Sequence, residues 1–377
     1  MSWPSRFKAL TAAALPLAIG LGLSVVMADG GANHQTKQTP PIQLGTSGGN
    51  VNDASKAFCC SGTLGALVER GGIRYILSNN HVLARSNQAA PGEDVSQPGL
   101  IDVGCNAANA NIVADFSQAP ALGTQNVDAA IAEVRGGAVS STGAIIDVGV
   151  PSSNPAAPAV NLQVAKSGRT TGLTCGGITS INTDVQVQYQ AGCGKGKKFR
   201  ITYQDQVVVT GSTFSAGGDS GSLIVSAGTA QPVALLYAGS STTTIGNPVG
   251  DVIAAFPGLS FVGGGNHAVS CPSGGGGSGG GKGGGGRPNA GQQPATPEQA
   301  RNAKAQYARS LMQDDAVLGV GVGEEDGEPV VVIYVEQGRE HRPLPQMLAG
   351  VRTRIIRTDE IRAFGWNERA GGGCKAR

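Results

Sequence analysis

Three short segments carry side chains that together could activate a serine. Ser220 lies in the run Gly-Gly-Asp-Ser-Gly-Ser, His81 in Ser-Asn-Asn-His-Val-Leu, and Asp128 in Asn-Val-Asp-Ala-Ala-Ile-Ala. A serine hydroxyl becomes a good nucleophile when an adjacent imidazole takes its proton, and a carboxylate on the other ring nitrogen must hold that imidazole. We therefore expect Ser220 to be the nucleophile, His81 the base and Asp128 the orienting carboxylate.

Each of these signals also has a plainer explanation. With 60 glycines in 377 residues, a serine between glycines is often part of a tight turn. A histidine after a strand, here predicted over Ile73–Leu77, is more often structural. Asp128 precedes an apolar run, and a buried aspartate needs a cationic or N–H partner. Because His81 is the one histidine of four framed by a predicted core, the three residues together favour catalysis.

Glycine around Ser220 allows a close backbone approach to a substrate. The N–H groups of Gly218 and Ser220 can point into one pocket. Two such donors would stabilise the oxyanion of a tetrahedral intermediate, by roughly 3–4 kcal/mol each. Asp219 is expected to turn inward and anchor the loop, which leads into a strand predicted over Ser222–Ser226.

The order His, Asp, Ser, with separations of 47 and 92 residues, resembles that of trypsin-like serine peptidases with the chymotrypsin fold. The resemblance covers roughly residues 50–262. Gly62–Val68 is similar to the family's strand before the histidine, and Val233–Gly239 to its substrate-pairing strand. Within the family the chain is most similar to divergent bacterial members with a small C-terminal domain. The resemblance implies two six-stranded barrels with the triad in the cleft between them, and substrate contacts at Tyr237 and Gly239.

The sequence also departs from the family. Asn79 and Asn80 precede the histidine and Val82 follows it, so the usual disulfide of the histidine loop cannot form in the same way. Six residues before the serine, where trypsin has an aspartate, this chain has Phe214. We assign Phe214 to substrate binding and expect a small or apolar residue beside the scissile bond rather than lysine or arginine.

Changes of composition along the sequence, above all the Gly-rich stretches, predict the domain organisation. An all-β double barrel is expected over 51–262, divided near 136–160, followed by a Gly-rich linker over 263–295 and a small α+β domain over 296–377. Thr296-Pro-Glu-Gln is typical of a helix start. Gly319–Gly323, Gly-Val-Gly-Val-Gly, is interpreted as a strand in close contact with its neighbour, although it also resembles a carboxylate-binding loop of peptide modules.

The N-terminus predicts export. A positive start, an apolar stretch over Ala9–Val26 and a small-residue exit indicate a signal peptide over 1–28. A retained single-span anchor is the alternative, disfavoured by Pro16 and the glycines. Residues 29–50 are expected to form a disordered leader. The protein would then be secreted or periplasmic, without stable insertion in the membrane after cleavage of the signal.

Export makes the seven cysteines candidates for disulfides. Cys175 and Cys193 flank a predicted hairpin and form the first expected pair. Cys59 or Cys60 is expected to reach Cys105. Cys271 and Cys374 either pair with each other or stay free, and the odd count leaves at least one thiol.

Composition excludes several function classes. The formal charge is only +2, and Lys195–Arg200 is interpreted as a solvated hairpin tip, so no nucleic-acid partner is expected. No motif predicts a metal or a cofactor, and none identifies the partner of the C-terminal domain. The sequence therefore predicts a serine endopeptidase acting on proteins or peptides. Two alternatives are a non-catalytic binding or adhesion protein on the same fold, and an esterase with the same triad.

Overall fold

Two β-sheets and three α-helices make up the described part of the chain. The computed structural model describes the protein except for residues 2–32, 57, 195, 273–293 and 364–377. The predicted signal peptide, most of the linker and Cys374 therefore lie outside the described residues. Among the residues described, no helix is long and apolar enough to span a membrane.

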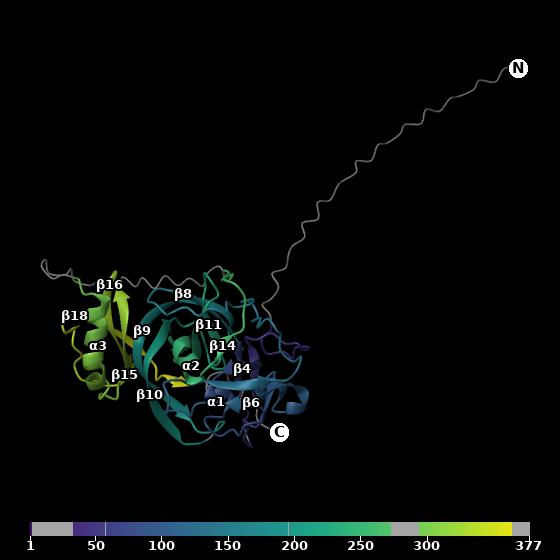
Figure 1. Ribbon diagram of the computed structural model, residues 1–377. Coiled ribbons are helices and arrows are strands. Elements are labelled where there is room, and N and C mark those ends of the chain that lie inside the picture. The colour runs from purple at the N-terminus through teal and green to yellow at the C-terminus, as the bar shows by residue number, and fades with distance from the viewer. Residues whose placement is uncertain (2–32, 57, 195, 273–293, 364–377) are drawn as a thin grey trace. The chain divides into compact units, whose positions relative to one another are not determined.

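The first sheet carries the segment with the candidate base (Figure 1). Its strand order is β14-β3-β4-β7-β6-β5-β1-β2. The strands are β1 (Thr46–Asn50), β2 (Gly62–Leu64), β3 (Ala66–Arg70), β4 (Ile73–Ser78), β5 (Asp94–Gln97), β6 (Asn111–Gln118), β7 (Ala130–Val134) and β14 (Ser260–Phe261). Between them lie the helix α1 (Asn80–Leu83) and the 3-10 turns η1 (Leu100–Val103) and η2 (Ala107–Asn109). Buried aliphatic side chains such as Leu77 and Ile131 form its core.

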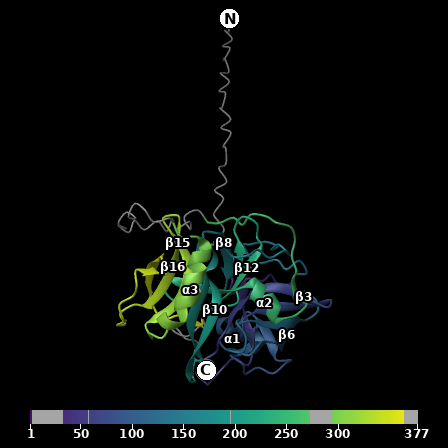
Figure 2. The ribbon, with the colours of Figure 1, turned by 60° about the vertical axis from the view of Figure 1, so that its left-hand side comes forward.

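The second sheet contains a closed ring of strands. The order β10-β13-β12-β11-β8-β9 is closed by a further pairing of β9 with β10, which makes a six-stranded barrel. Its strands are β8 (Gln163–Gly168), β9 (Gly172–Gln190), β10 (Lys198–Thr210), β11 (Leu223–Ser226), β12 (Pro232–Gly239) and β13 (Thr243–Pro248). The helix α2 (Val249–Ala255) packs on β12 and β13 (Figure 2). The predicted all-β double barrel is confirmed. The first barrel contains eight strands rather than the six expected, because the short strands β14 and β2 lie at the two ends of its strand order.

A small α+β unit follows, also as predicted. It consists of α3 (Pro297–Leu311), β15 (Val317–Glu325), β16 (Glu328–Glu336), β17 (Met347–Leu348), β18 (Val351–Thr358) and β19 (Arg362–Ala363). The helix α3 lies against β15 and β16 (Figure 1). Its start is a capping box, in which the Thr296 hydroxyl accepts from the Gln299 N–H and the Gln299 side chain accepts from the Thr296 N–H.

The Gly-Val-Gly-Val-Gly run lies inside β15 and pairs with β9 of the second barrel. A Cβ atom on Gly321 would lie 2.2 Å from the Thr183 hydroxyl oxygen, and one on Gly319 would lie 2.8 Å from the Asp184 carbonyl oxygen. Larger residues would therefore force the two strands apart. The prediction of a close strand contact is confirmed, and β15 joins the small unit to the barrel in one continuous sheet.

Two segments expected to lack structure are ordered. Residues 33–50 are not a disordered leader, since β1 pairs with β2 and β5, and the buried His34 ring contacts the Gly45 carbonyl oxygen at 2.7 Å. Likewise the first residues of the predicted linker, 263–272, are packed, and Gly264 bridges to Ser152. The polar composition of the two segments gave no sign of this structure, because their backbones pair with residues distant in the sequence.

Three disulfides are formed: Cys59–Cys105, Cys60–Cys193 and Cys175–Cys271. The pairing with Cys105 is thus confirmed for Cys59. The predicted Cys175–Cys193 bridge is wrong, because Cys175 lies near the start of the long strand β9 and Cys193 lies just beyond its end. At about 3.3 Å per residue, such a strand separates its ends by tens of ångströms, far beyond the roughly 7 Å that a disulfide tolerates between Cα atoms. The expectation for Cys271 is also wrong, since it bonds Cys175.

Candidate active site

His81 and Asp128 form a buried pair at one edge of the first sheet. His81 lies in α1, directly after β4, and Asp128 lies just before β7, the neighbour of β4. The imidazole Nδ1 lies 2.6 Å from Asp128 Oδ2, and the His81 backbone N–H donates to Oδ1 at 3.2 Å. With Nδ1 donating to the carboxylate, Nε2 is free to accept a proton. Nε2 has no hydrogen-bond partner among the described residues.

Other residues hold Asp128 in place. The Tyr189 hydroxyl donates to Asp128 Oδ2 at 2.8 Å. The Asp128 backbone N–H donates to the Asn247 side chain at 2.9 Å, and the Asn79 side chain donates to the Asp128 carbonyl oxygen at 2.7 Å. The carboxylate is completely buried, so these contacts and His81 replace the water it lacks.

Sequence reasoning missed Tyr189 and Asn247. Buried side chains alternate along β9, at Val185, Val187 and Tyr189, so the tyrosine points into the molecule. Burial, with the neighbouring Asp128 charge, raises the pKa of Tyr189 well above its usual range, so its hydroxyl keeps the proton that it donates. The alternation was a usable signal for the orientation of Tyr189. Nothing in the sequence indicated which carboxylate it would meet.

Ser220 lies in the loop between β10 and β11 and is completely buried. Its hydroxyl donates to the Tyr237 carbonyl oxygen on β12 at 3.2 Å, and its own carbonyl oxygen accepts from the Thr63 N–H at 2.8 Å. Among the described residues, no hydrogen bond joins Ser220 to His81. The structure thus assembles the predicted His81–Asp128 pair and leaves the third residue bonded elsewhere.

The Ser220 backbone nevertheless lies beside α1. A Cβ atom on Gly62 would come within 2.6 Å of Val82 Cγ2 and 2.9 Å of the Ser220 carbonyl oxygen. Gly62 therefore fits between the residue after His81 and the loop that carries Ser220. Only a glycine permits this approach of the two segments.

The backbone of this loop is left-handed at Gly218. Gly218 has φ +97°, a conformation that favours glycine, and its carbonyl oxygen accepts from the Thr63 hydroxyl at 2.9 Å. This contact turns the carbonyl away, toward β2. In the described part of the chain, the N–H groups of Gly218 and Ser220 have no hydrogen-bond partner. They remain the candidate oxyanion donors.

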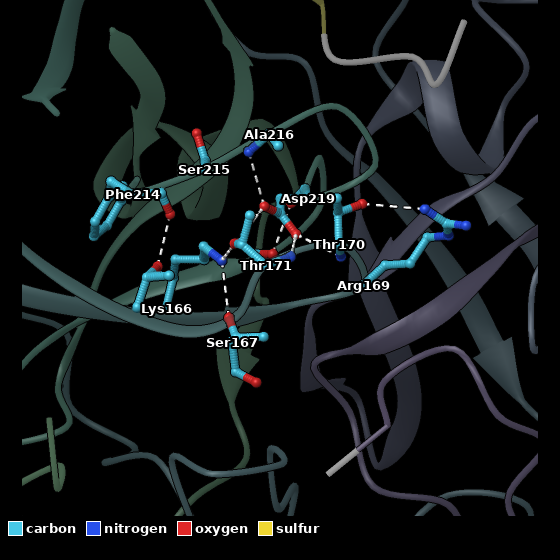
Figure 3. A network of polar contacts seen from close by, with 12 residues as sticks. Lys166, Ser167, Arg169, Thr170, Thr171, Phe214, Ser215, Ala216 and Asp219 are labelled. Atoms are coloured by element: carbon cyan, nitrogen blue, oxygen red, sulfur yellow. Dashed lines mark hydrogen bonds and ion pairs between the residues drawn. The ribbon is translucent and has the colours of Figure 1, made fainter. Parts of the chain in front are cut away.

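Asp219 anchors this loop through a buried network (Figure 3). Its Oδ1 accepts from the N–H groups of Thr170, at 2.9 Å, and Thr171, at 3.2 Å. Its Oδ2 accepts from the Thr171 hydroxyl at 2.7 Å and the Ala216 N–H at 3.0 Å, and lies 3.4 Å from Lys166 Nζ. Lys166 and Asp219 are both 0% exposed, and burial lowers the pKa of the lysine despite the neighbouring carboxylate. The inward turn expected for Asp219 is present.

A cavity of about 470 Å³ lies beside the candidate residues. His81 and Gly239 line it, together with Ser215 and Ala216. Phe214 does not: it is 2% exposed and packs in the barrel core with residues such as Val209. The predicted assignment of Phe214 to substrate binding therefore lacks a geometric basis, because the loop turns Phe214 inward and its neighbours Ser215 and Ala216 outward.

Tyr237 contributes its backbone rather than its ring. The ring packs in a second buried cluster, with its centroid 5.1 Å from that of Tyr203. Its carbonyl oxygen is the acceptor for Ser220. Of the three residues assigned to substrate binding, only Gly239 lines the cavity.

Asp53 is a buried carboxyl group that also lines the cavity. Burial raises its pKa to about 7, although Arg85 and His81 oppose this. Its oxygens lie near the sulfur atoms of Cys60 and Cys193, which are bonded to each other and therefore lack the free thiolates that a metal would need. Sequence reasoning did not single out Asp53.

Comparison with known proteins places the chain among particular solved structures. It is similar to a glutamic acid-specific serine protease, with 22% identity and a TM-score of 0.42, over 58% of this chain and 100% of the other. An alpha-lytic protease homologue, N4, has 23% identity and a TM-score of 0.41, over 58% and 98% of the two chains. Protease A of Thermobifida fusca has 21% identity and a TM-score of 0.40, over 59% and 99%.

No protein-family model and no curated protein matches the sequence. The three neighbours are proteases.

Proposed function

We propose that the protein is an exported serine endopeptidase whose catalytic part spans residues 33–272, wider than the predicted 51–262 because β1 and residues 263–272 pack with it, with 296–377 as an appended domain. The observation that carries the proposal is the buried His81–Asp128 pair, with Nδ1 on the carboxylate and Nε2 without a partner. With the Nδ1 proton facing the carboxylate, Nε2 is the ring nitrogen placed to accept a proton. The loop carrying Ser220 is separated from the same helix by Gly62, which leaves no room for a side chain between them.

The reaction would proceed through an acyl-enzyme. Rotation of the Ser220 side chain exchanges the Tyr237 carbonyl oxygen for His81 Nε2 as acceptor. The hydroxyl oxygen then attacks the peptide carbonyl carbon while Nε2 takes its proton, and Asp128 stabilises the imidazolium. The N–H groups of Gly218 and Ser220 would bind the oxyanion. His81 returns the proton to the leaving amine, and water hydrolyses the ester by the same steps in reverse order.

A peptide substrate would pair with the edge of β12 near Gly239. Gly239 lines the same cavity as His81, and an extended peptide can add to an exposed strand edge through backbone hydrogen bonds. Proteins or peptides are therefore the proposed substrate class.

The three disulfides support a secreted or periplasmic location. Disulfides persist in oxidising compartments and are rare in the cytosol. The two bridges from Cys59 and Cys60 fix the segment that leads into β2, directly beneath the Ser220 loop.

One observation favours the alternative of a non-catalytic binding protein. Ser220 is completely buried and its hydroxyl bonds a backbone carbonyl oxygen rather than His81. A protein that kept the residues but never released this hydroxyl would bind peptides without cleaving them. An esterase would use the same steps on an ester carbonyl.

A fluorophosphonate probe separates these functions. We expect it to label the wild-type protein on Ser220 and not to label Ser220→Ala, with both proteins showing the same thermal unfolding. Absence of labelling in a folded wild-type protein would favour the binding protein. Turnover of casein compared with turnover of short-chain esters then divides a peptidase from an esterase.

A further inference from the structure

The edge of β12 beside the candidate site is already occupied by the chain itself. The tail segment, defined here as residues 359–363, ends in β19, which pairs with two strands of the barrel. Arg362 lies opposite Gly239 and Ala363 opposite Ala238, in antiparallel register with β12. Arg362 also lies opposite Gln188 in parallel register with β9, and the Gln188 N–H donates to the Ile361 carbonyl oxygen at 2.9 Å.

The occupied edge is the one on which Ser220 lies. The other edge of β12 pairs with β13 as far as Gly239. On this edge, β11 pairs with β12 up to Leu235, the Gly221 N–H donates to the Leu236 carbonyl oxygen, and the Ser220 hydroxyl donates to that of Tyr237. The tail segment takes the next two positions. It therefore occupies the place proposed above for a peptide substrate.

Side chains fix the tail segment in this place. Ile361 is 1% exposed and packs in the cluster that contains Tyr237. Glu360 accepts from Arg200 on β10 at 2.9 Å and from Arg362 at 3.0 Å. Asp359 accepts from the Ser241 hydroxyl in the turn after β12.

The tail segment also forms part of the cavity wall. Arg362 and Ala363 line the cavity together with His81 and Gly239. A peptide reaching His81 along β12 would have to displace them, because one edge of a strand accepts only one partner at a time.

We propose that the tail segment is an intramolecular competitor for the peptide-binding edge of β12, so that the chain in this conformation inhibits itself. The inference rests on the proposed function for the identity of that edge. A tether gives such a segment an effective concentration on the order of millimolar, so that a free peptide competes at a disadvantage.

Two substitutions at one position test the competition in the full-length protein. Arg362→Pro removes the backbone N–H and restricts Ile361, and so should release the segment. Arg362→Ala keeps the N–H and is the matched control. Amide exchange at Gln188, whose N–H donates to Ile361, reports release directly and does not depend on catalysis.

We expect Arg362→Pro to accelerate exchange at Gln188 and to lower KM for a peptide substrate at least tenfold with little change in kcat. Arg362→Ala loses the side-chain contact with Glu360 but keeps the backbone pairing, so it should change both quantities much less. A synthetic peptide with the sequence of residues 358–363 should raise KM of Arg362→Pro again. Faster exchange with unchanged KM would overturn the inference. So would unchanged exchange in both Arg362→Pro and a second variant, Ile361→Asp, since the segment would then be a permanent strand.

Labelling of Ser220 by the fluorophosphonate reports the proposed function separately. If Ser220 is labelled but Arg362→Pro leaves KM unchanged, only the self-inhibition is refuted. If no variant is labelled, the proposed hydrolase function is wrong. Calorimetric measurement of binding of the synthetic peptide then shows whether the tail segment competes for the edge of β12. Binding to Arg362→Pro and not to Arg362→Ala would support competition, and binding to neither would refute it.

Discussion

Two buried carboxylates, one beside each barrel, hold the two halves of the candidate site in different ways. Asp128 contacts the imidazole of His81 directly, so it fixes the orientation of the proposed base. Asp219 contacts Lys166 and the N–H groups of neighbouring loops, so it sets only the backbone on which Ser220 stands.

The comparison shows that the side chain of His81 is held by a direct contact with its carboxylate. Near Ser220, the carboxylate holds only the loop backbone. The His81 ring is held by Asp128, whereas the Ser220 side chain would have to rotate, as proposed above, to exchange the Tyr237 carbonyl oxygen for another acceptor. Because the loop below is fixed by five contacts, that rotation need not move the backbone. The predictions below separate a chemical role for each carboxylate from a structural one.

The largest effect is expected from Ser220→Ala. It leaves both carboxylate networks intact and removes the attacking oxygen, so turnover should fall by about 10⁵–10⁶-fold. Peptide hydrolysis and thermal unfolding measured side by side check this. Residual activity near wild type would place the nucleophile elsewhere.

Asp128→Asn should lower kcat by about 10⁴-fold, because an amide can hold the imidazole in the wrong tautomer. Proton NMR of the His81 ring nitrogens would show the exchange of the tautomer. A variant with unchanged kcat would mean that Asp128 has a structural role only.

Lys166→Met tests the second carboxylate. It leaves Asp219 buried without its cation, and loss of one partner of a buried ion pair costs about 3–5 kcal/mol of unfolding free energy. Chemical denaturation measures this cost. The double variant Lys166→Met/Asp219→Asn should recover part of it. If the single and double variants were equally stable, the ion pair would not be what holds the loop.

Asp53 provides a contrast, a buried carboxyl group whose pKa of about 7 shows that burial outweighs its favourable neighbours. As pH rises from about 4 to 7, the unfolded chain loses this proton and the folded chain keeps it, so stability falls over that range. Asp53→Asn removes the penalty. We expect the variant to gain up to about 4 kcal/mol over wild type at pH 8 and little at pH 4. Thermal melts at the two pH values check this, and an equal gain at both would contradict it.

The smallest effect is expected from Tyr189→Phe. It removes one hydrogen bond to the Asp128 carboxylate, worth about 1.5–3 kcal/mol, and should lower kcat more than it raises KM. Thr171→Val removes the corresponding hydroxyl contact of Asp219 and is the matched control on the other side. The two variants should differ in the pH profile of kcat, which only Tyr189→Phe should shift.

Local context in the sequence was enough to find the His81–Asp128 pair. His81 follows a strand that the sequence predicted and Asp128 precedes an apolar run, and the two strands concerned, β4 and β7, are neighbours in the sheet. Tyr189 and Asn247 could not be found in this way, because they reach Asp128 from 61 and 119 residues away, across the two barrels. Side-chain patterns show which face of a strand is buried, but not what it meets there.

The errors have a common physical origin as well. The cysteine pairing failed because β9 is one long strand where a hairpin was expected between Cys175 and Cys193. Residues 33–50 were read as a leader because backbone pairing is independent of side-chain polarity, so that a glycine-rich stretch such as β1 gives no hydrophobic signal.

The glycine-rich strand β15 has a consequence for handling the protein in pieces. It covers the backbone of β9 between Ser180 and Val185, next to the stretch that β8 covers. A shortened version that lacks everything after residue 272 would leave these amide and carbonyl groups unpaired at the edge of the sheet. Such an edge is a template for pairing with other chains. We expect such a fragment to aggregate or to pair with its own copies. An assay on the barrels alone would therefore test a molecule that is more prone to aggregation than the full-length protein.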